Sequence, residues 1–190
     1  MSAVPAAPVG RGARARERVM AAALDQLADE GSAGFTMEAI ARRAGASKAT
    51  LYRRWPSASA LLVDAMATTF RPLRTPPGDD VREELVALLT LASEMLASGR
   101  FPRLMAAIVD LAERDRALAA LHSGVTAQQR RPVLELVRRA QAQGEIAPDA
   151  DPEVVVDMLT APFFYRRLVA HRPIPTTLAR SIVDQVLLRR

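Results

Sequence analysis

The stretch that decides the fold is GFTMEAIARRAGASKATLYRRWPSASALLVDAM, residues 34–66. Thr36 and Ser47 each precede a short run of apolar residues at helical spacing, and both residue types are preferred helix N-caps. Gly45 lies between the two runs, where a glycine commonly ends a helix. The pattern predicts two short helices joined by a tight turn.

Helical periodicity continues on both sides of this stretch, and no segment of useful length alternates as a strand does. Alanine, leucine and arginine are frequent while aromatic residues make up 4%, which also favours helices. The sequence predicts an all-α fold of about nine helices. The expected helices span residues 14–30, 36–43, 48–54, 58–70, 80–98, 102–111, 114–143, 152–170 and 176–188.

Two modules are expected, with a boundary near RPLRTPPGDD, residues 71–80, because three prolines and a glycine cannot continue a helix. Residues 1–13, rich in Ala, Pro, Gly and Arg, are predicted to be a flexible basic arm. Residues 14–57 form a three-helix unit, the helix at 58–70 is a link, and residues 71–190 form the larger helical module.

Two prolines lie inside predicted helices. Pro132 and Pro162 each remove a backbone donor, so each is expected to kink or divide its helix. A bend that wraps the helix around a core is one interpretation. In the other, Pro162 and the aromatic residues 163–165 open space for a ligand. The helix at 152–170 has a well-marked start, with Asp151 as cap and Pro152 in the first turn.

Composition limits the classes of protein that fit. The chain has 190 residues, of which 49% are hydrophobic, enough for a substantial core. It has no cysteine, no uncharged apolar run of membrane-spanning length and no secretory signal pattern, so we expect a cytoplasmic protein. The net charge is +5, and residues 1–55 carry nine cations against five anions, so the excess lies where a polyanion could use it.

Two short helices after a longer one make a helix-turn-helix, in which the N-terminal end of the last helix reaches base edges in the DNA major groove. Here that end presents Ser47, Lys48, Ala49 and Thr50. Lys48, the only lysine, can donate to guanine, and Thr50 can contact a phosphate or a thymine methyl. Tyr52 either flanks this surface or packs half-buried.

These motifs together make residues 34–66 resemble the N-terminal domain of the tetracycline-repressor (TetR) family of bacterial transcription regulators. The matching positions are Phe35-Thr36, Ile40-Ala41, Ala44-Gly45, Ser47, Thr50-Leu51-Tyr52, the aromatic Trp55 and Leu61. They cover about a third of the chain. Residues 144–174 look like the variable domain of a common branch of that family, though less specifically.

The resemblance implies a homodimer that binds a palindromic double-stranded DNA operator, usually as a repressor released by a small molecule bound in the larger module. It places base contacts at Lys48, Ala49 and Thr50, and contacts to the DNA backbone at Thr36, Met37, Ser47, Tyr52, Arg53 and Arg54. Ala58 departs from the pattern, because the family often has a phosphate-binding lysine there. Arg53 and Arg54, with Arg11, Arg14 and Arg16 of the arm region, can supply charge instead.

The larger module offers candidates for the other two sites. A ligand pocket is expected among its methionines, aromatics and aliphatics, which adapt to apolar ligands; each is also a plausible core residue. The pocket candidates are Met95, Phe101, Leu104, Met105, Ile108, Leu121, His122, Val125, Phe163, Phe164 and Tyr165. Apolar stripes on the last two helices suggest a dimer interface that includes Val155, Leu159, Leu178, Ile182, Val183, Val186 and Leu187, although part of each stripe must be intrachain core.

No other chemistry is indicated. The sequence shows no phosphate-binding glycine loop, nucleophile elbow, paired catalytic carboxylates or metal-ligand spacing around its two histidines, so we expect no enzyme activity, no metal and no cofactor. No anionic cluster suggests a cationic ligand, so the expected effector is hydrophobic or neutral and polar. The alternative function is a basic helical scaffold or an RNA-binding module without operator specificity.

Overall fold

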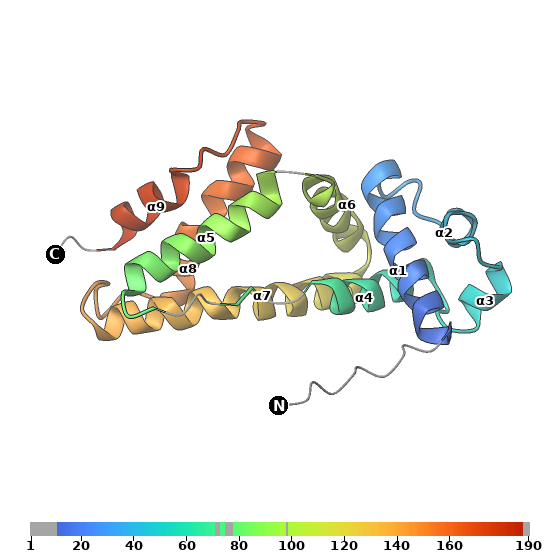
Figure 1. Ribbon diagram of the computed structural model, residues 1–190, viewed down its shortest axis with the longest axis horizontal. Coiled ribbons are helices and arrows are strands. Elements are labelled where there is room, and N and C mark those ends of the chain that lie inside the picture. The colour runs from blue at the N-terminus through green and yellow to red at the C-terminus, as the bar shows by residue number, and fades with distance from the viewer. Residues whose placement is uncertain (1–10, 71–72, 75–77, 98, 188–190) are drawn as a thin grey trace, which may run out of the picture.

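The computed structural model describes residues 11–70, 73–74, 78–97 and 99–187, and within them the chain is helical without any strand (Figure 1). The predicted all-α fold is confirmed. The elements are α1 (Arg11–Glu30), α2 (Met37–Ala44), α3 (Lys48–Tyr52), α4 (Ala58–Thr69), α5 (Val81–Ala97), α6 (Phe101–Arg114), α7 (Arg116–Ala142), α8 (Pro152–Phe164), a π-helical turn (Tyr165–Val169) and α9 (Leu178–Val186).

The region from α1 to α4, residues 11–70, is called the head below. The turn between α2 and α3 has the geometry expected of a helix-turn-helix, because Gly45 adopts the left-handed conformation, with φ 60° and ψ 39°. Thr36 and Ser47 are the N-caps of α2 and α3, as predicted: their hydroxyl oxygens accept from the amides of Ala39 and Thr50, each at 3.2 Å.

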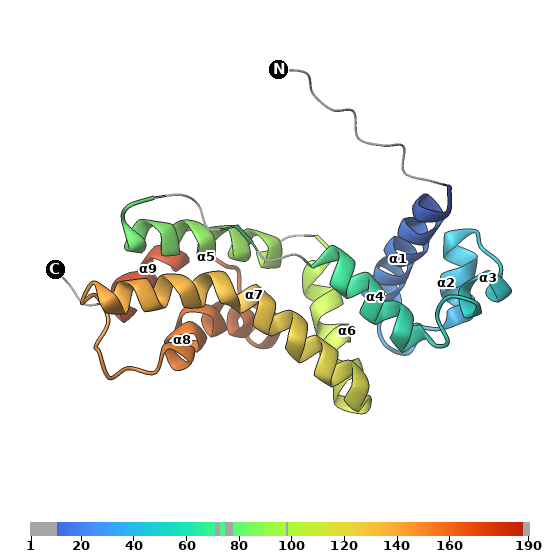
Figure 2. The same ribbon diagram turned by 90° about the horizontal axis from the view of Figure 1, so that it is seen from below.

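The buried residues form two hydrophobic cores, and residues of one core do not all come from one continuous part of the chain. The core of the head includes Leu104 and Ile108 of α6 and Leu118 from the start of α7. The second core joins α5, the C-terminal half of α7, α8 and α9. Helix α7 therefore connects the two, and Figures 1 and 2 show it running along most of the molecule.

The two internal prolines act differently. Pro132 is buried inside α7, which continues through it without division. Downstream of Pro162, α8 ends at Phe164 and the chain continues as a π-helical turn, in which the amide of Ala170 bonds the carbonyl of Tyr165 at 2.8 Å. Because a proline cannot donate to the regular helical ladder, a change in hydrogen-bond register nearby is expected.

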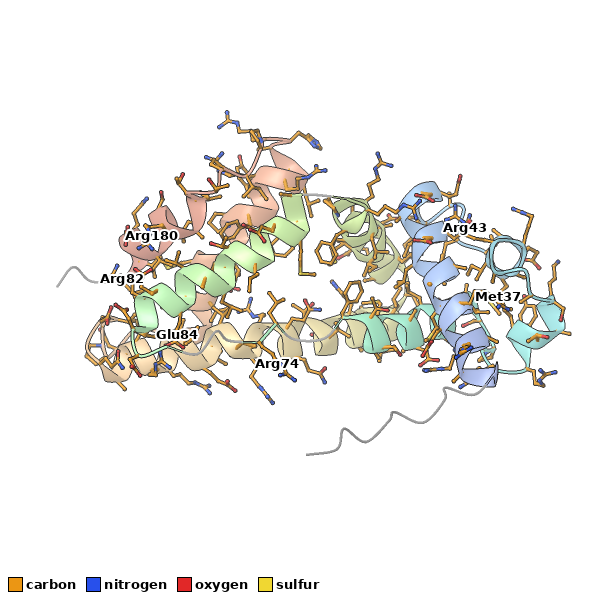
Figure 3. All side chains as sticks on the ribbon, viewed as in Figure 1. Met37, Arg43, Arg74, Arg82, Glu84 and Arg180 are labelled. Atoms are coloured by element: carbon orange, nitrogen blue, oxygen red, sulfur yellow. The ribbon has the colours of Figure 1, made fainter. Side chains whose placement is uncertain are left out.

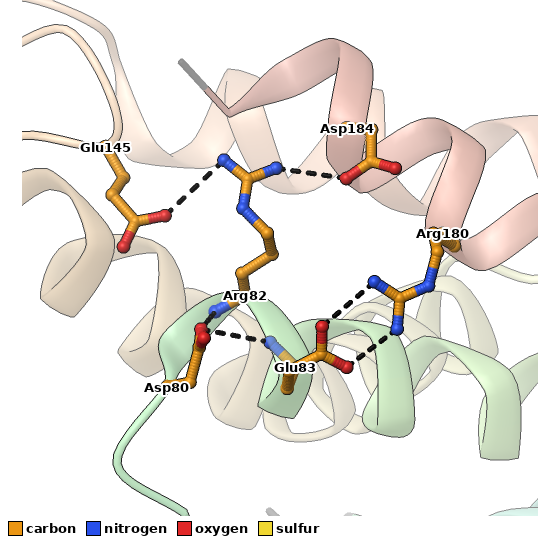
Figure 4. A network of polar contacts seen from close by, with 6 residues as sticks. All are labelled: Asp80, Arg82, Glu83, Glu145, Arg180 and Asp184. Atoms are coloured by element: carbon orange, nitrogen blue, oxygen red, sulfur yellow. Dashed lines mark hydrogen bonds and ion pairs between the residues drawn. The ribbon is translucent and has the colours of Figure 1, made fainter. Parts of the chain in front are cut away.

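Ion pairs fasten the end of the second module that lies farthest from the head (Figure 3), and Figure 4 shows several of them from close by. Arg82 of α5 lies 3.1 Å from Asp184 of α9 and 3.5 Å from Glu145 in the α7–α8 loop. Arg180 of α9 pairs with Glu83 at 2.7 Å. Glu84 of α5, labelled in Figure 3, is almost fully buried and pairs with Arg139 of α7. These contacts hold α9 and α7 against α5.

The predicted basic arm is only partly inside the described region. Residues 1–10 lie outside it. Helix α1 begins at Arg11, three residues earlier than predicted, so residues 11–13 are helical. Arg14 is exposed on α1, and Arg16 is partly buried.

Candidate nucleic-acid interface

The N-terminal end of α3 projects from the head with its side chains in solvent. Lys48, Ala49 and Thr50 are all exposed, whereas Leu51 is completely buried and Trp55 is 5% exposed. The inward placement of Leu51 and Trp55 is as predicted. Because α3 is capped by Ser47 and backed by two buried side chains, its three exposed residues are held in fixed positions on the surface.

Lys48 forms an ion pair on the surface of the head. Its Nζ atom lies 2.8 Å from a carboxylate oxygen of Glu38 on α2. The hydrogen bond from Lys48 is the main reason why the pKa of Glu38 lies below its usual value. Both side chains are about half exposed, so the pair is accessible to water and easily exchanged for another partner.

The residues expected to meet the phosphate backbone differ in exposure. Arg53 and Arg54 are exposed. Tyr52 is 48% exposed, which fits either the flanking position or the half-buried packing residue. Thr36 is exposed, but Met37 is 4% exposed and lies inside the head (Figure 3). Only its backbone amide, at the first position of α2, is placed to face an anion.

A basic hollow lies between the start of α1 and α3. Its volume is about 610 Å³, and Arg16, Arg18, Arg53 and Arg54 line it together with the hydroxyl groups of Ser47 and Thr50. Ala58, the position without the expected lysine, is partly buried against the core. The arginines of the hollow supply positive charge beside α3 where that lysine is missing.

Asp64 of α4 ties three elements of the head together. Its carboxylate accepts a hydrogen bond from the indole of Trp55 at 2.9 Å and forms an ion pair with Arg16 of α1. Arg54 stacks over the Trp55 ring at 5.6 Å. Burial acts to raise the pKa of Asp64, but the hydrogen bonds from Trp55 and Arg16 outweigh it and hold the pKa below its usual value. No pattern in the sequence predicts this link, because Arg16 lies 48 positions before Asp64 in the chain.

The predicted pocket residues separate into several environments. Met95, Phe101, Phe163 and Phe164 line one cavity of about 120 Å³ between α4, α5, α6, α7 and α8. Leu104 and Ile108 are buried in the core of the head, and Met105 and Val125 pack against it, so these four are core residues rather than cavity residues. Leu121 and Tyr165 are exposed. Burial lowers the pKa of His122, which lies in a separate open hollow with Glu113 and Arg131.

Sequence reasoning missed several residues of the cavity wall. Phe70 closes α4 and packs edge-on against Phe101, with ring centroids 5.9 Å apart. Gln129 of α7 and Thr160 of α8 also line the cavity. A polar residue in a helix gives no sign of which neighbour it faces, so neither could have been chosen from the sequence.

The residues predicted to form a dimer interface are mostly interior. Leu159 and Val183 are fully buried within one chain, and Val155, Ile182 and Leu187 are at most 8% exposed. They belong to the core shared with α5 because α8 and α9 both pack on that helix. Leu178 and Val186 are partly buried against the same core. The five buried side chains are therefore core residues of the single chain, whereas the position of the dimer interface stays a prediction.

A different face of α8 is apolar and exposed. Val154 and Met158 are 53% and 54% exposed, and Tyr165 in the π-helical turn is 61% exposed. With the exposed Ala161, they recur at intervals of three and four, so they share one side of the helix. The sequence pattern could not separate this stripe from the buried one, because α8 is apolar on both sides.

Two family models cover most of the chain. Residues 19–65 match the model described as bacterial regulatory proteins, tetR family, and residues 75–186 match the model of a tetracyclin repressor-like C-terminal domain. The second match spans more than half of the chain. The chain belongs to the TetR family. The head is thus the helix-turn-helix domain of a TetR-family transcriptional regulator, and the expected DNA-binding function is confirmed.

Known TetR-family proteins resemble the chain over nearly its full length. The DNA-binding transcriptional repressor TetR of Mycobacteroides abscessus is 29% identical over 187 residues, covering 95% of each chain. The uncharacterized HTH-type transcriptional regulator Rv1556 of Mycobacterium tuberculosis is 28% identical, covering 90% of this chain and 84% of that protein. The crystal structure of the TetR family transcription regulator SCO0332 is 32% identical, covers 90% of this chain and 96% of that one, and superposes with a TM-score of 0.65.

TetR-family regulators bind operator DNA and form dimers that respond to small molecules, and repression released by an effector is typical of the family. Among the described residues, no group of three or more potential ligands could hold a metal ion. Within the described part of the chain, no helix has the length and hydropathy to cross a bilayer.

Proposed function

We propose that this TetR-family regulator represses transcription from a palindromic operator by placing α3 in the major groove. Lys48, Ala49 and Thr50 face the base edges. The observation that supports this is the exposed, capped end of α3 beside a basic hollow of about 610 Å³. A lysine donates to guanine acceptors, and a small alanine lets the helix approach the bases closely.

The phosphate contacts flank these base contacts. Arg53, Arg54 and the hydroxyl groups of Ser47 and Tyr52 approach the backbone from α3 and the residues next to it, and the start of α2 contributes Thr36 and the amide of Met37. Such contacts fix the register of the protein on the duplex without reading its sequence. Arg16 and Arg18 at the start of α1 add charge on the opposite wall of the hollow.

The dimer forms through the exposed stripe of α8, which is Val154, Met158, Ala161 and Tyr165. Packing this stripe against its copy around a two-fold axis buries Val154, Met158 and Tyr165, which are each more than half exposed in the single chain. A two-fold dimer presents two α3 helices, which is why the operator is expected to be a palindrome with half-sites one helical turn or more apart.

Binding of a hydrophobic or neutral-polar effector in the cavity beside Phe70 and Phe101 releases the operator. These two rings join the end of α4, a head helix, to the start of α6. A ligand that separates them favours a different placement of α4 and so of the head, which weakens binding to two fixed half-sites. The Mycobacteroides abscessus relative is itself named as a DNA-binding repressor.

The test is selection of bound sequences from random DNA, followed by electrophoretic measurement of affinity for the selected site and for shuffled DNA. A palindromic consensus, bound at least a thousandfold more tightly than shuffled DNA, supports the proposal. Salt-sensitive binding that ignores sequence contradicts it and favours the basic scaffold. Binding of single-stranded or structured RNA with higher affinity than DNA also contradicts it.

A further inference from the structure

The wall of the effector cavity has an unusual composition for this chain. The protein has five phenylalanines, and four of them, Phe70, Phe101, Phe163 and Phe164, line a single cavity of about 120 Å³. They come from α4, α6 and α8, so the fold gathers most of the scarce phenylalanine at one place. Phe70 and Phe101 already meet edge to face, at an interplanar angle of 75°.

A second hollow of about 170 Å³ adjoins the first one. Gln129 of α7 and Thr160 of α8 are among the residues that line both, together with Phe164. The two volumes are therefore neighbouring parts of one space, with polar groups where they meet. The combined volume suits a molecule with one ring or with two fused rings.

The polar side chains that line both hollows differ in whether another group of the protein already hydrogen-bonds to them. The Thr160 hydroxyl donates to the carbonyl of Val156 at 2.8 Å and keeps only acceptor capacity. Gln129 is partly buried, and its side-chain amide makes no hydrogen bond to any residue in the described part of the chain. An amide that faces an apolar wall without a protein partner can offer a ligand both a donor and an acceptor.

Charge is lacking at this site. Among the described residues that line the cavity beside Phe70, none is charged. Arg130 lines the adjoining hollow, but Asp157 and Glu153 of α8 already bind its guanidinium. An ionised ligand would therefore lose its hydration without gaining an available counter-charge, which is strongly unfavourable.

From these observations we infer that the effector is an uncharged aromatic molecule with a hydrogen-bonding group, and that Gln129 is the residue that recognises this group. Aromatic rings pack well edge to face against phenylalanine. The amide then selects ligands by a hydroxyl, carbonyl or ring nitrogen. The inference rests on the proposed role of the cavity as the effector site, and it adds the chemical class of ligand and the residue that sets specificity.

The test uses the full-length protein and four probes of similar size: 2-naphthol, 2-methylnaphthalene, 2-naphthoate and n-decanol. Dissociation constants are measured by calorimetry at pH 7. The wild-type protein should bind 2-naphthol more tightly than the carboxylate or the linear alcohol. Tighter binding of 2-naphthoate or n-decanol, or no binding of 2-naphthol at its solubility limit, overturns the inference without any variant.

The role of Gln129 is read from a ratio, the affinity for 2-naphthol divided by that for 2-methylnaphthalene. Gln129→Leu removes the amide while keeping much of its volume, so this ratio should fall about three- to tenfold. Gln128→Leu is the matched control, because Gln128 is the neighbouring residue and is exposed; it should leave the ratio unchanged. An unchanged ratio in Gln129→Leu, or an equal fall in Gln128→Leu, shows that Gln129 is not the recognition residue.

Affinity for the selected DNA, measured without any probe, separates this inference from the proposed function. If the protein binds a palindromic operator but none of the aromatic probes, the inference fails and the proposed function stands. If the probes bind with the expected order but the protein does not select DNA, the proposed function fails, and the cavity is an aromatic binding site with another role.

Discussion

Lys48 is the only lysine in the chain, and the structure holds it at the exposed end of α3 in a pair with Glu38. Replacing it with alanine should reduce discrimination at one base pair of each half-site by about 1–3 kcal/mol. Arg54→Ala is the comparison, since loss of a phosphate contact should weaken binding to all sequences alike. Both are measured by repeating the DNA selection. An unaltered consensus with Lys48→Ala would remove Lys48 from the base contacts.

Glu38 restrains Lys48 and adds negative charge close to the expected path of the DNA. Glu38→Gln should therefore raise affinity for selected and shuffled DNA together, because it removes repulsion from phosphates and releases the lysine. The measurement is the dissociation constant at several salt concentrations, with the gain expected to shrink as salt rises. Weaker binding by the variant would mean that the pair positions Lys48 for the base contact.

Asp64 should make the stability of the head depend on pH. Its pKa is lowered in the folded protein, so its contribution is present above the unfolded value of about 4 and is lost as pH falls through the folded pKa. Asp64→Asn should destabilise by about 1 kcal/mol at pH 7, and this difference from wild type should shrink below about pH 4. Urea unfolding followed by the fluorescence of Trp55 measures it. Asp149→Asn, at an exposed position, should show no difference at either pH.

At the scale of single elements, replacing glycine with alanine should change stability in opposite directions at two positions. Gly45 ends α2 in the left-handed conformation, whereas Gly124 lies inside α7 with open space around it. Gly45→Ala should destabilise by about 1 kcal/mol because of backbone strain. Gly124→Ala should stabilise by about 0.5–1 kcal/mol because alanine favours helix. Chemical denaturation gives both values, and equal signs would contradict the backbone explanation.

For the whole molecule, the head is completed by α6. Ile108 is fully buried in the core of the head, although it lies 38 positions after Phe70, the last residue of the head. Ile108→Ala should destabilise by about 2–5 kcal/mol, seen in the fluorescence of Trp55, and should weaken DNA binding with it. Val109, the next residue, is 44% exposed, so Val109→Ala should stay within about 0.5 kcal/mol of wild type. If the head of Ile108→Ala unfolds at the same denaturant concentration as that of wild type, the core of the head is independent of α6.

The dimer is the second property of the whole molecule. A charge placed at Met158, in the middle of the exposed α8 stripe, would be buried without a partner in the proposed interface. Met158→Glu should give a folded monomer by light scattering, with strongly reduced affinity for the full operator. Val109→Glu, on an exposed site of α6, should remain dimeric. A Met158→Glu protein that stays dimeric would place the interface elsewhere.

The sequence by itself determined the local structure. The caps Thr36, Ser47 and Asp151, the turn at Gly45 and the inward-facing pair Leu51 and Trp55 all follow from interactions within a few residues, so periodicity and residue type suffice to predict them. The family motif predicted the function for the same reason, because it is a contiguous stretch of sequence whose residues form one surface.

Only the tertiary structure decided which side of each apolar helix is interior. Leu159 is core and Met158 is exposed, yet both lie in one apolar helix whose pattern cannot tell a core contact from a partner contact. The same holds for Ile108 in the core of the head, for the Asp64–Trp55 link and for Gln129 in the cavity wall. Each depends on how separate helices pack against one another, and that packing minimises exposed apolar surface over the whole molecule rather than within any one segment.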